Sequence, residues 1–581
     1  MGTVFPHFIR EGSYSKGSIA TGDPLREVTV YKQVLDPVSH SLGLTSIFAV
    51  LPLVVLFVLL GVVRLKAQWA AVVTLGVALI VAVAVYSMPV GQAGDSALEG
   101  AAFGAFPIMW IVLNALWIYN MTDATGHFAV LRRAFSSVSD DIRVQVVVVA
   151  FCFGALLEAL AGFGTPVAIC GIMLVGLGLK PVKAAAVALV ADTAPVAFGA
   201  IAIPIVTLGQ VSGLPVNDLG AMVGRQTPFL ALLIPFVLVF MVGGRRGVRE
   251  VWPAALTAGL VFALLQFAVS NYVSVPLTDI IAALGSAGAV VALLRVWQPG
   301  EPAQVVRTQR PAIAGAAVAD PAMTRRVRAE RGHRLPPSDL VLAFAPYAII
   351  VVVLGVTSIT GVQTELDKLT TKFSWPGLHV LNAKGKAPTS ELFKLNWFTA
   401  AGTWLFVCGV LTALVLRVRP ARALEIYWQT LKQIKWAILT VCSVLALAYV
   451  MNMSGQTITL GTWAAGAGAF FAFISPLIGW FGTAVTGSDT STNSLFGALQ
   501  VAAAHKSGLS PTLMAAANSS GGVLAKMISP QNLAIGAAAV GLAGQEGDIF
   551  RRVIGWSVVL VLLMAVLVLL QSTGALSWMV V

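Results

Sequence analysis

Long runs of apolar residues, separated by short polar segments, dominate the chain. Windows of 18 or more apolar residues recur, for example at 42–63 and 553–570. A helix needs about 20 such residues to cross a bilayer, so the pattern predicts about twelve transmembrane helices. They are expected near residues 42–63, 67–86, 103–121, 184–210, 228–243, 251–270, 279–296, 339–360, 397–416, 433–453, 512–544 and 553–573.

Two further apolar blocks, residues 144–180 and 461–507, match neither one span nor two. The first contains the sequence GFGTP at residues 162–166, which cannot continue a helix, and the second contains the polar run TGSDTSTN at residues 486–493. We interpret both as re-entrant hairpins. The predicted fold is therefore an all-α polytopic membrane protein, with about twelve spans and two hairpins.

Basic residues gather in alternate loops, as the positive-inside rule requires of cytoplasmic loops. The segment 87–102 has acidic residues and no Lys or Arg, so we expect it outside. The cytoplasmic groups are Arg64 and Lys66; Arg132, Arg133 and Arg143; Arg245, Arg246 and Arg249; Arg417, Arg419 and Arg422; and Arg551 and Arg552. With this orientation the hairpins enter from opposite faces and both termini lie outside. The loop at 361–396 is an exception, since it carries five lysines yet must be external.

The same pattern divides the chain into four regions. Residues 1–41 form an N-terminal extramembrane segment, and residues 42–296 form a first transmembrane half with the hairpin at 144–180. Residues 297–338, rich in Arg, Pro and Ala, are expected to be a cytoplasmic linker. Residues 339–581 form a second half with the hairpin at 461–507.

Composition excludes several classes of function. The chain is 57% hydrophobic and 11% charged, whereas a soluble domain carries about 25% charged residues. Its net charge of +12 resides in loops between spans, and without an aromatic-basic motif we expect no nucleic-acid partner. The four cysteines lie in apolar segments without metal-ligand spacing, and no catalytic motif is present. We therefore expect no metal, no cofactor and no enzymatic activity.

Short matches in the same order indicate an internal repeat. If the hairpins enter from opposite faces, the copies form an inverted-topology repeat, a common plan of secondary transporters. Unrelated Gly- and Pro-rich spans, packed through small residues, are the alternative. The matches are FGT at 163–165 with FGT at 481–483, GLKP at 178–181 with GLSP at 508–511, AAA at 184–186 with AAA at 515–517, and the breaks at Pro195 and Pro204 with the break at 529–532.

Ionisable residues at membrane depth are the candidates for chemistry. Each costs about 2.5 to 3.5 kcal/mol near a helix centre, and four are recognised: Glu158, Asp192, Asp489 and Lys526. Buried carboxylates can exchange protons, which makes Glu158 and Asp192 the candidates for proton coupling, with a structural ion pair as the alternative. Lys526 could pair with an acid or attract an anion.

Broken helices supply the second kind of candidate. Their N-termini present free N–H groups and partial positive charge, which suit a substrate carboxylate. Hydroxyls and amides near the breaks can bind a hydroxyl-bearing anion. The substrate-binding candidates are Gly164, Thr165, Thr193, Ser488, Asp489, Thr490, Ser491, Asn518, Lys526 and Asn532.

Five long strings give the chain a family resemblance: LLEALAGFGTPVAI, LVADTAPVAFGAIAIP, VGRQTPF, GWFGTAVTGSDTSTNSLFG and NSSGGVLAKMISPQNLAIG. The chain resembles the bacterial lactate permease family, from about Asp36 to the final span. The resemblance implies a proton symporter of lactate and glycolate in the cytoplasmic (inner) membrane. Its hairpins are also similar to those of the wider ion-transporter superfamily, whose members often work by an elevator motion. The Arg-rich stretch at 300–338 and the Lys-rich external loop depart from the family.

The resemblance leads to a hypothesis for the site. The tips of the two hairpins meet near the midplane and enclose the substrate, whose carboxylate binds N–H groups and the hydroxyls of Thr165, Ser488, Thr490 and Ser491. Its 2-hydroxyl binds Asn518 or Asn532. The partners are a monocarboxylate, a proton and the lipid bilayer, and a homodimer is considered. Sodium-coupled transport of another organic anion, a channel or membrane-bound enzyme, and a structural scaffold are the alternatives.

Overall fold

The fold is built almost entirely of helices, as the apolar pattern predicts. The computed structural model describes residues 30–162, 164–300, 336–383, 385–386 and 392–581. In this part of the chain, 10 helices are long and apolar enough to cross a membrane, or 11 if one bent pair counts as a span. The chain is therefore a multi-pass, all-helical membrane protein. Phe163, most of the Arg-rich linker and most of the N-terminal segment lie outside the described residues.

The helices fall into two groups, one before and one after the Arg-rich linker. The first group is α1 (Leu42–Phe57), α2 (Ala67–Ala84), α3 (Val90–Phe103), α4 (Trp110–Ala124), α5 (His127–Ser136), α6 (Ile142–Val146), α7 (Gly154–Leu160), α8 (Thr165–Gly176), α9 (Pro181–Ala191), α10 (Gly199–Ser212), α11 (Val216–Val223), α12 (Thr227–Tyr272) and α13 (Thr278–Val296). The second group is α15 (Pro337–Thr357), α16 (Thr360–Asp367), α17 (Ala401–Val415), α18 (Pro420–Ser454), α19 (Gln456–Ala464), α20 (Phe471–Thr486), α21 (Asp489–Ser507), α22 (Pro511–Gly522), α23 (Pro530–Ala539) and α24 (Glu546–Gln571).

Two pairs of short strands accompany the helices. β1 (Tyr31–Lys32) pairs in parallel with β3 (Val380–Leu381), and β2 (Thr371–Ser374) pairs antiparallel with β4 (Leu392–Leu395). Three of these strands belong to the 361–396 loop, so that loop has secondary structure of its own.

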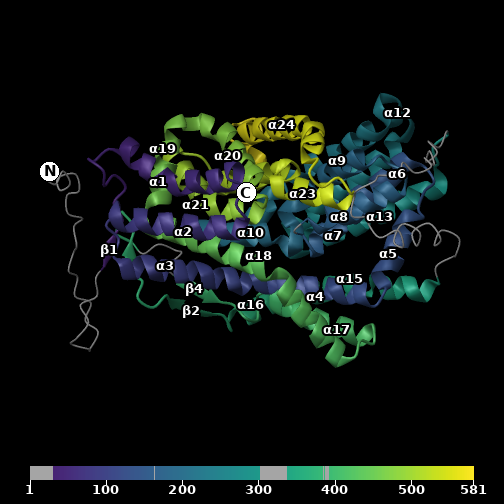
Figure 1. Cartoon of the computed structure of the whole chain (residues 1–581), viewed down its shortest axis with the longest axis horizontal. Coiled ribbons are helices and arrows are strands. Elements are labelled where there is room, and N and C mark those ends of the chain that lie inside the picture. The colour runs from purple at the N-terminus through teal and green to yellow at the C-terminus, as the bar shows by residue number, and fades with distance from the viewer. Residues whose placement is uncertain (1–29, 163, 301–335, 384, 387–391) are drawn as a thin grey trace.

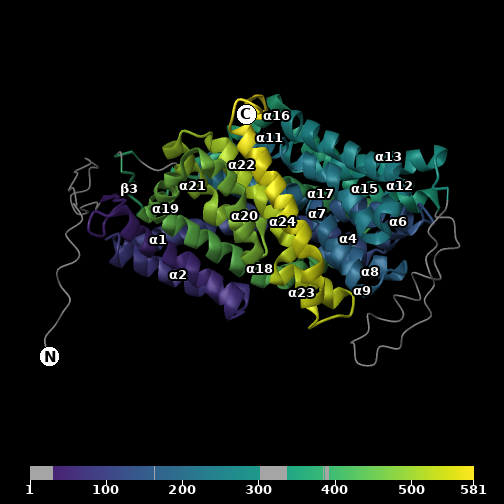
Figure 2. The same cartoon turned by 90° about the horizontal axis from the view of Figure 1, so that it is seen from above.

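The two halves of the sequence share one hydrophobic core. Helices α17 and α18 of the second half pack on α2, α3 and α4 of the first, and one buried cluster includes residues from both halves. Figures 1 and 2 show α1 and α2 at one end of the molecule and α12 and α13 at the other, with α7, α10, α20 and α23 between them.

Each predicted hairpin block is two helices joined by a sharp break at a glycine. In the first, a helical stretch from Ile142 to Leu160 ends, and α8 starts after Gly164, whose φ is 81°. In the second, α20 and α21 are separated by Gly487, whose φ is 76°, and by Ser488. Glycine adopts this left-handed conformation without the steric cost that other residues have.

Both hairpin blocks return to where they began. Near the start of the first block, Arg143 packs against Gly243 and Gly247 of α12, and just after its end Lys183 Nζ donates to Val242 O of the same helix, at 3.0 Å. In the second block, Ser507 Oγ donates to Ala465 O at 3.4 Å. The beginning and the end of each block therefore lie close together in space.

Two predicted spans are broken in the structure. The span expected at 184–210 is α9 and α10, bent by 65° at the break between them. The span expected at 512–544 is α22 and α23, separated by a 3-10 segment at Val523–Ile528. Proline contributes to both breaks, because Pro195 and Pro530 lack the N–H that a continuous helix needs.

Three further expectations are corrected. Residues 87–102, expected as an external loop, mostly form α3, which is held by packing on α18. The spans expected at 228–243 and 251–270 are joined as α12 through non-helical residues at Gly244 and Val251. The second FGT, at 481–483, lies inside α20 and not at the tip, so its pairing with the first FGT was wrong.

Several contacts join loops that the basic residues place on the same side of the membrane. At the end expected to be external, Tyr31 Oη donates to Tyr86 O at 3.1 Å and to Ser454 O at 2.9 Å. At the same face, Arg225 donates to Asn271 Oδ1 at 2.9 Å and to Met579 O at 3.0 Å. At the other end, Arg143 pairs with Glu250, so loops expected on one side of the membrane contact one another.

Candidate functional site

A buried ammonium lies between two buried carboxylates at the centre of the molecule. Lys526 Nζ is 2.6 Å from Glu158 Oε1 and 3.0 Å from Asp192 Oδ2. The three residues come from the last turn of α7, the C-terminal end of α9 and the 3-10 segment after α22. Glu158, Asp192 and Lys526 are 4%, 3% and 6% exposed, respectively. Three helix ends from both halves of the sequence therefore meet at one ion cluster.

The cluster is closely packed yet incompletely paired. A Cβ atom at Gly199, just after the break that follows α9, would lie 2.8 Å from Glu158 Oε1, so only glycine leaves room for the carboxylate. Glu158 Oε2 and Asp192 Oδ1 are buried and have no hydrogen-bond partner among the described residues. An unpaired buried oxygen is costly, and a proton or a ligand donor at these atoms would remove that cost.

The backbone next to the cluster is also unusual. Ala200, Ile201 and Ala202 have φ values of 45°, 60° and 58°, a conformation that side chains with a Cβ atom rarely adopt. Such strain persists only where the surrounding structure imposes it, and it occurs preferentially at functional sites. The break after α9 is therefore a distorted segment held in place by its neighbours.

Asn532, at the start of α23, contacts the tips of both hairpins. Its Nδ2 donates to Gly487 O at 3.1 Å and to Ser529 Oγ at 2.8 Å. On its other side, a Cβ atom at Gly164 would lie 3.4 Å from Asn532 Oδ1. The two tips therefore lie on either side of one asparagine side chain.

Asp489 is held inside the second tip. Its Oδ2 accepts from Ser519 Oγ at 2.5 Å and from Asn493 Nδ2 at 3.3 Å, whereas Oδ1 has no partner among the described residues. Ser488 caps α21 by accepting from Ser491 N. The carboxylate is 2% exposed, so it faces protein and not a wet loop.

The remaining predicted residues differ in their surroundings. The hydroxyls of Thr165 and Thr490 are half-buried and make no hydrogen bond to described residues, so they are open to a ligand. Thr193 donates to Val190 O at 2.7 Å. Asn518 lies in an interior network, donating to Asn493 Oδ1 at 2.8 Å and accepting from Gln500 at 3.1 Å.

A second set of buried polar residues was not predicted from the sequence. Asp279, near the start of α13, accepts from Gln266 Nε2 at 2.9 Å, and Gln226 links Ser520 to Gln571. Asp279 is 1% exposed. Asp279 is the first residue of the span predicted at 279–296, and an acid at such a position usually marks the solvated end of a helix. The absence of any adjacent basic residue was the signal that could have identified it.

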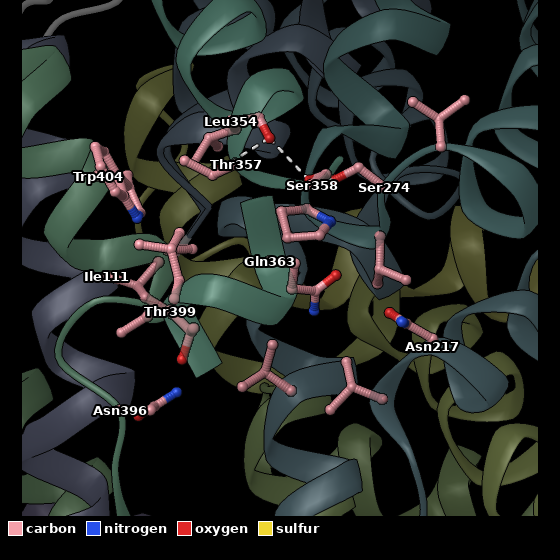
Figure 3. Close-up of a pocket in the computed structure, with 18 of the residues that line it drawn as sticks. Ile111, Asn217, Ser274, Leu354, Thr357, Ser358, Gln363, Asn396, Thr399 and Trp404 are labelled. Atoms are coloured by element: carbon pink, nitrogen blue, oxygen red, sulfur yellow. Dashed lines mark hydrogen bonds between the residues drawn. The ribbon is translucent and has the colours of Figure 1, made fainter. Parts of the chain in front are cut away.

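A cavity of about 420 Å³ opens at the end expected to be external (Figure 3). It lies between α4, α10, α11, α15, α16 and α17, and the segment 270–276 forms part of its wall. Among the described residues, its polar lining has no charged side chain and includes Asn217, Ser274, Ser358, Gln363 and Asn396. Ser358 Oγ donates to Ser274 Oγ at 2.9 Å. In the same described part of the chain, no group of three or more His, Cys, Asp or Glu side chains could hold a metal ion.

Comparisons with known proteins agree on one family. The family model described as L-lactate permease matches residues 45–573. The glycolate permease GlcA of Escherichia coli is 40% identical over 91% of this chain and 96% of its own length. An L-lactate permease of Bacillus subtilis is 39% identical over 95% of this chain and 100% of its own length.

Similarity to solved structures is much weaker. MtrF of Neisseria gonorrhoeae has a TM-score of 0.45 at 12% identity, over 82% of this chain and 83% of that one. This likeness is too slight to assign the arrangement of the helices.

Proposed function

Because the chain belongs to the L-lactate permease family, we propose that it carries lactate, glycolate and related 2-hydroxymonocarboxylates across the bacterial cytoplasmic membrane by proton symport. The substrates follow from the names of its relatives, one a glycolate permease and others L-lactate permeases. Proton coupling is the finer part of the proposal, and the buried charges support it.

The observation that carries proton coupling is the excess of carboxylates over cations at the site. Glu158 and Asp192 contact one ammonium, Lys526, and Asp489 is near enough to feel its charge. Each of the three carboxylates has one buried oxygen without a partner among the described residues. A monocarboxylate would add a further negative charge. Moving unbalanced charge through the membrane interior is expensive, and a proton on Glu158 or Asp192 lowers that cost for the loaded carrier.

We further propose that α7–α10 and α20–α23 form an inverted repeat with re-entrant hairpins. The contacts are reciprocal: α8 packs on α23 and α21 packs on α10, while α9 packs on α24 and α22 packs on α11. Such an exchange of partners is expected if a two-fold axis relates the copies. The return of each hairpin to its starting loop supports the same arrangement. An elevator movement of this core is the transport mechanism we favour.

Within the repeat, we assign the substrate to the space beside the two tips. Its carboxylate binds the N-terminal ends of α8 and α21, where free N–H groups and the hydroxyls of Thr165 and Thr490 are available. Its 2-hydroxyl binds Asn532, which already contacts both tips. We prefer Asn532 to Asn518 as the partner of the 2-hydroxyl, because the Asn518 side chain is already hydrogen-bonded to Gln500 and Asn493.

Transport by Glu158→Gln in membrane vesicles tests the proposal. The variant should no longer accumulate L-lactate against its gradient under an imposed proton gradient, but should keep exchange of labelled for unlabelled lactate. Glu425→Gln is the matched control, since Glu425 lies on α18, is exposed and pairs with Arg422 at the surface. Undiminished accumulation by Glu158→Gln would remove this residue from the mechanism.

Sodium coupling is the alternative, and the same vesicles distinguish it. If the proton gradient drives uptake, replacing sodium by potassium leaves accumulation unchanged. If accumulation instead follows the sodium gradient at constant pH, proton symport is wrong. Competition by D-lactate and glycolate then ranks the substrates.

A further inference from the structure

Asp279 is a buried carboxylate that the proposed site does not use. It lies in the first turn of α13, is 1% exposed, and its Oδ2 has no hydrogen-bond partner among the described residues. Asp279 also makes no ion pair with a described cation. An unpaired acid at this depth is too costly to be retained for packing alone, so a role in handling charge or protons is indicated.

Gln266 of α12 holds Asp279 in one orientation. Gln266 Nε2 donates to Asp279 Oδ1 at 2.9 Å and lies 3.4 Å from Ala194 O, in the break that follows Asp192. Its own carbonyl accepts from Thr227 Oγ1 at 3.1 Å. Because the amide occupies Oδ1, the other carboxylate oxygen is left as the atom that can gain or lose a proton.

Asp279 belongs to a stretch of chain that joins the wall of the outer cavity to a helix packed against α7. The segment Ser274–Pro276, three to five residues before it, forms part of the cavity wall (Figure 3). On its other side, α13 packs on α7, the helix that carries Glu158, and the charges of Asp279 and Glu158 are close enough to interact. Asp279 thus follows the cavity wall by three residues in the sequence and interacts through charge with the proposed proton site.

We propose that Asp279 carries protons between the external cavity and the Glu158–Asp192–Lys526 cluster. A hydronium ion in the cavity gives a proton to the ionised Asp279 at Oδ2 and becomes water. The carboxylic acid then passes that proton to the ionised Glu158, while the Gln266 amide stays bonded to Oδ1. Asp279 ends the step ionised and Glu158 ends it neutral, so no net charge enters the core apart from the proton. This inference rests on the proposed proton symport.

Few groups other than Glu158 can influence Asp279. Of the elements packed against α13, α7 contributes Glu158 and α12 contributes the neutral Gln266. The π-helical turn at Val147–Phe153 contributes Cys152, whose thiol lies 3.4 Å from Ser286 Oγ, two turns further along α13. The turn at Val275–Leu277 has no titratable group, and the nearest such residue of α15, Tyr347, interacts instead with Tyr119.

Asp279→Asn and Asp279→Glu in proteoliposomes test the inference. With Asn, proton-driven accumulation of labelled L-lactate should fall about tenfold or more, and the initial rate of uptake should lose its dependence on external pH. Lactate counterflow, which needs no net proton movement, should remain within about twofold of the native protein. Glu restores an ionisable group and should recover at least part of both lost properties.

Asp218→Asn is the matched control, because Asp218 lies at the same face in the first turn of α11 and is only half-buried. Accumulation by Asp279→Asn equal to that of this control overturns the inference. Loss of counterflow in both Asp279 variants also overturns it, since the residue would then be needed for folding. If the native protein itself shows no proton-driven uptake, the proposed symport fails instead, and the two failures are thus distinguishable.

Discussion

At Gly522 the side chain is a single hydrogen because a carboxylate occupies the adjacent space. A Cβ atom there would lie 2.3 Å from Asp489 Oδ1 and 2.8 Å from Thr483 Oγ1. The end of α22 can approach the second hairpin tip this closely only through glycine. Gly199 has the same relation to Glu158 in the first half of the chain, so both acids are packed against a glycine next to a helix break.

Gly522→Ala should therefore impair transport more than it impairs folding. Overpacking costs about 1–3 kcal/mol, and a shift of that size in the arrangement of the tip corresponds to about 5- to 150-fold in function. The measurement is the initial rate of lactate uptake, normalised to the amount of protein in the membrane. Gly555→Ala on α24 is the control, because its Cβ would meet no atom within 4 Å. Equal uptake rates for the two variants would contradict the conclusion that transport needs the close packing of Gly522 against Asp489.

At the scale of elements, a charged cluster fixes the base of the first hairpin. Arg143, in the first turn of α6, bonds through Nε and Nη2 to Asp141 at 3.0 and 2.7 Å, and also pairs with Glu250 where α12 bends. The side chains of Arg143 and Asp141 are 5% and 1% exposed. Arg246, the other partner of Glu250, lies on the surface, and its side chain is 77% exposed.

Arg143→Ala should destabilise the protein strongly, by about 3–5 kcal/mol, because it removes one partner of a buried ion pair. Arg246→Ala removes an exposed pair with the same Glu250 and should cost about 1 kcal/mol or less. The thermal unfolding of the purified variants in detergent gives this comparison. Equal shifts of Tm would mean that the cluster does not fix the hairpin base.

At the scale of the whole molecule, the apolar pattern and the family both indicate a membrane transporter. The expectation of a membrane transporter rather than an enzyme is confirmed by membership of a permease family, and the long apolar helices confirm a multi-pass membrane protein. The orientation in the membrane stays a prediction, which the contacts between loops expected on the same side support.

Labelling with a membrane-impermeant thiol reagent checks that orientation. Lys394→Cys, exposed on β4, should react in intact cells, whereas Arg245→Cys, exposed where α12 bends, should react only after permeabilisation. The native protein is the control, because Cys152, Cys170 and Cys408 are buried and Cys442 is half-buried. The opposite labelling pattern would reverse the membrane orientation, and with it the outer position given to Asp279.

The sequence by itself determined the features that depend on local chemistry. Apolar runs of bilayer length can only be satisfied by helices in lipid. Clusters of glycine, proline and small polar residues favour helix breaks, which is why the breaks near Gly164, Pro195 and Ser488 were predictable, whereas isolated prolines such as Pro52 and Pro476 lie inside helices. Glu158 and Asp192 were recognised because a charge within an apolar run is conspicuous in the sequence alone.

Only the tertiary structure decided which of these residues meet. The pairing of Lys526 with Glu158 joins residues 368 positions apart, and no local pattern specifies such a contact. Packing on α18 made α3 a helix where its sequence resembled a loop. Burial of Asp279 depends on the helices around it, because an acid at a helix end is solvated or enclosed according to its neighbours and not according to its own residue type.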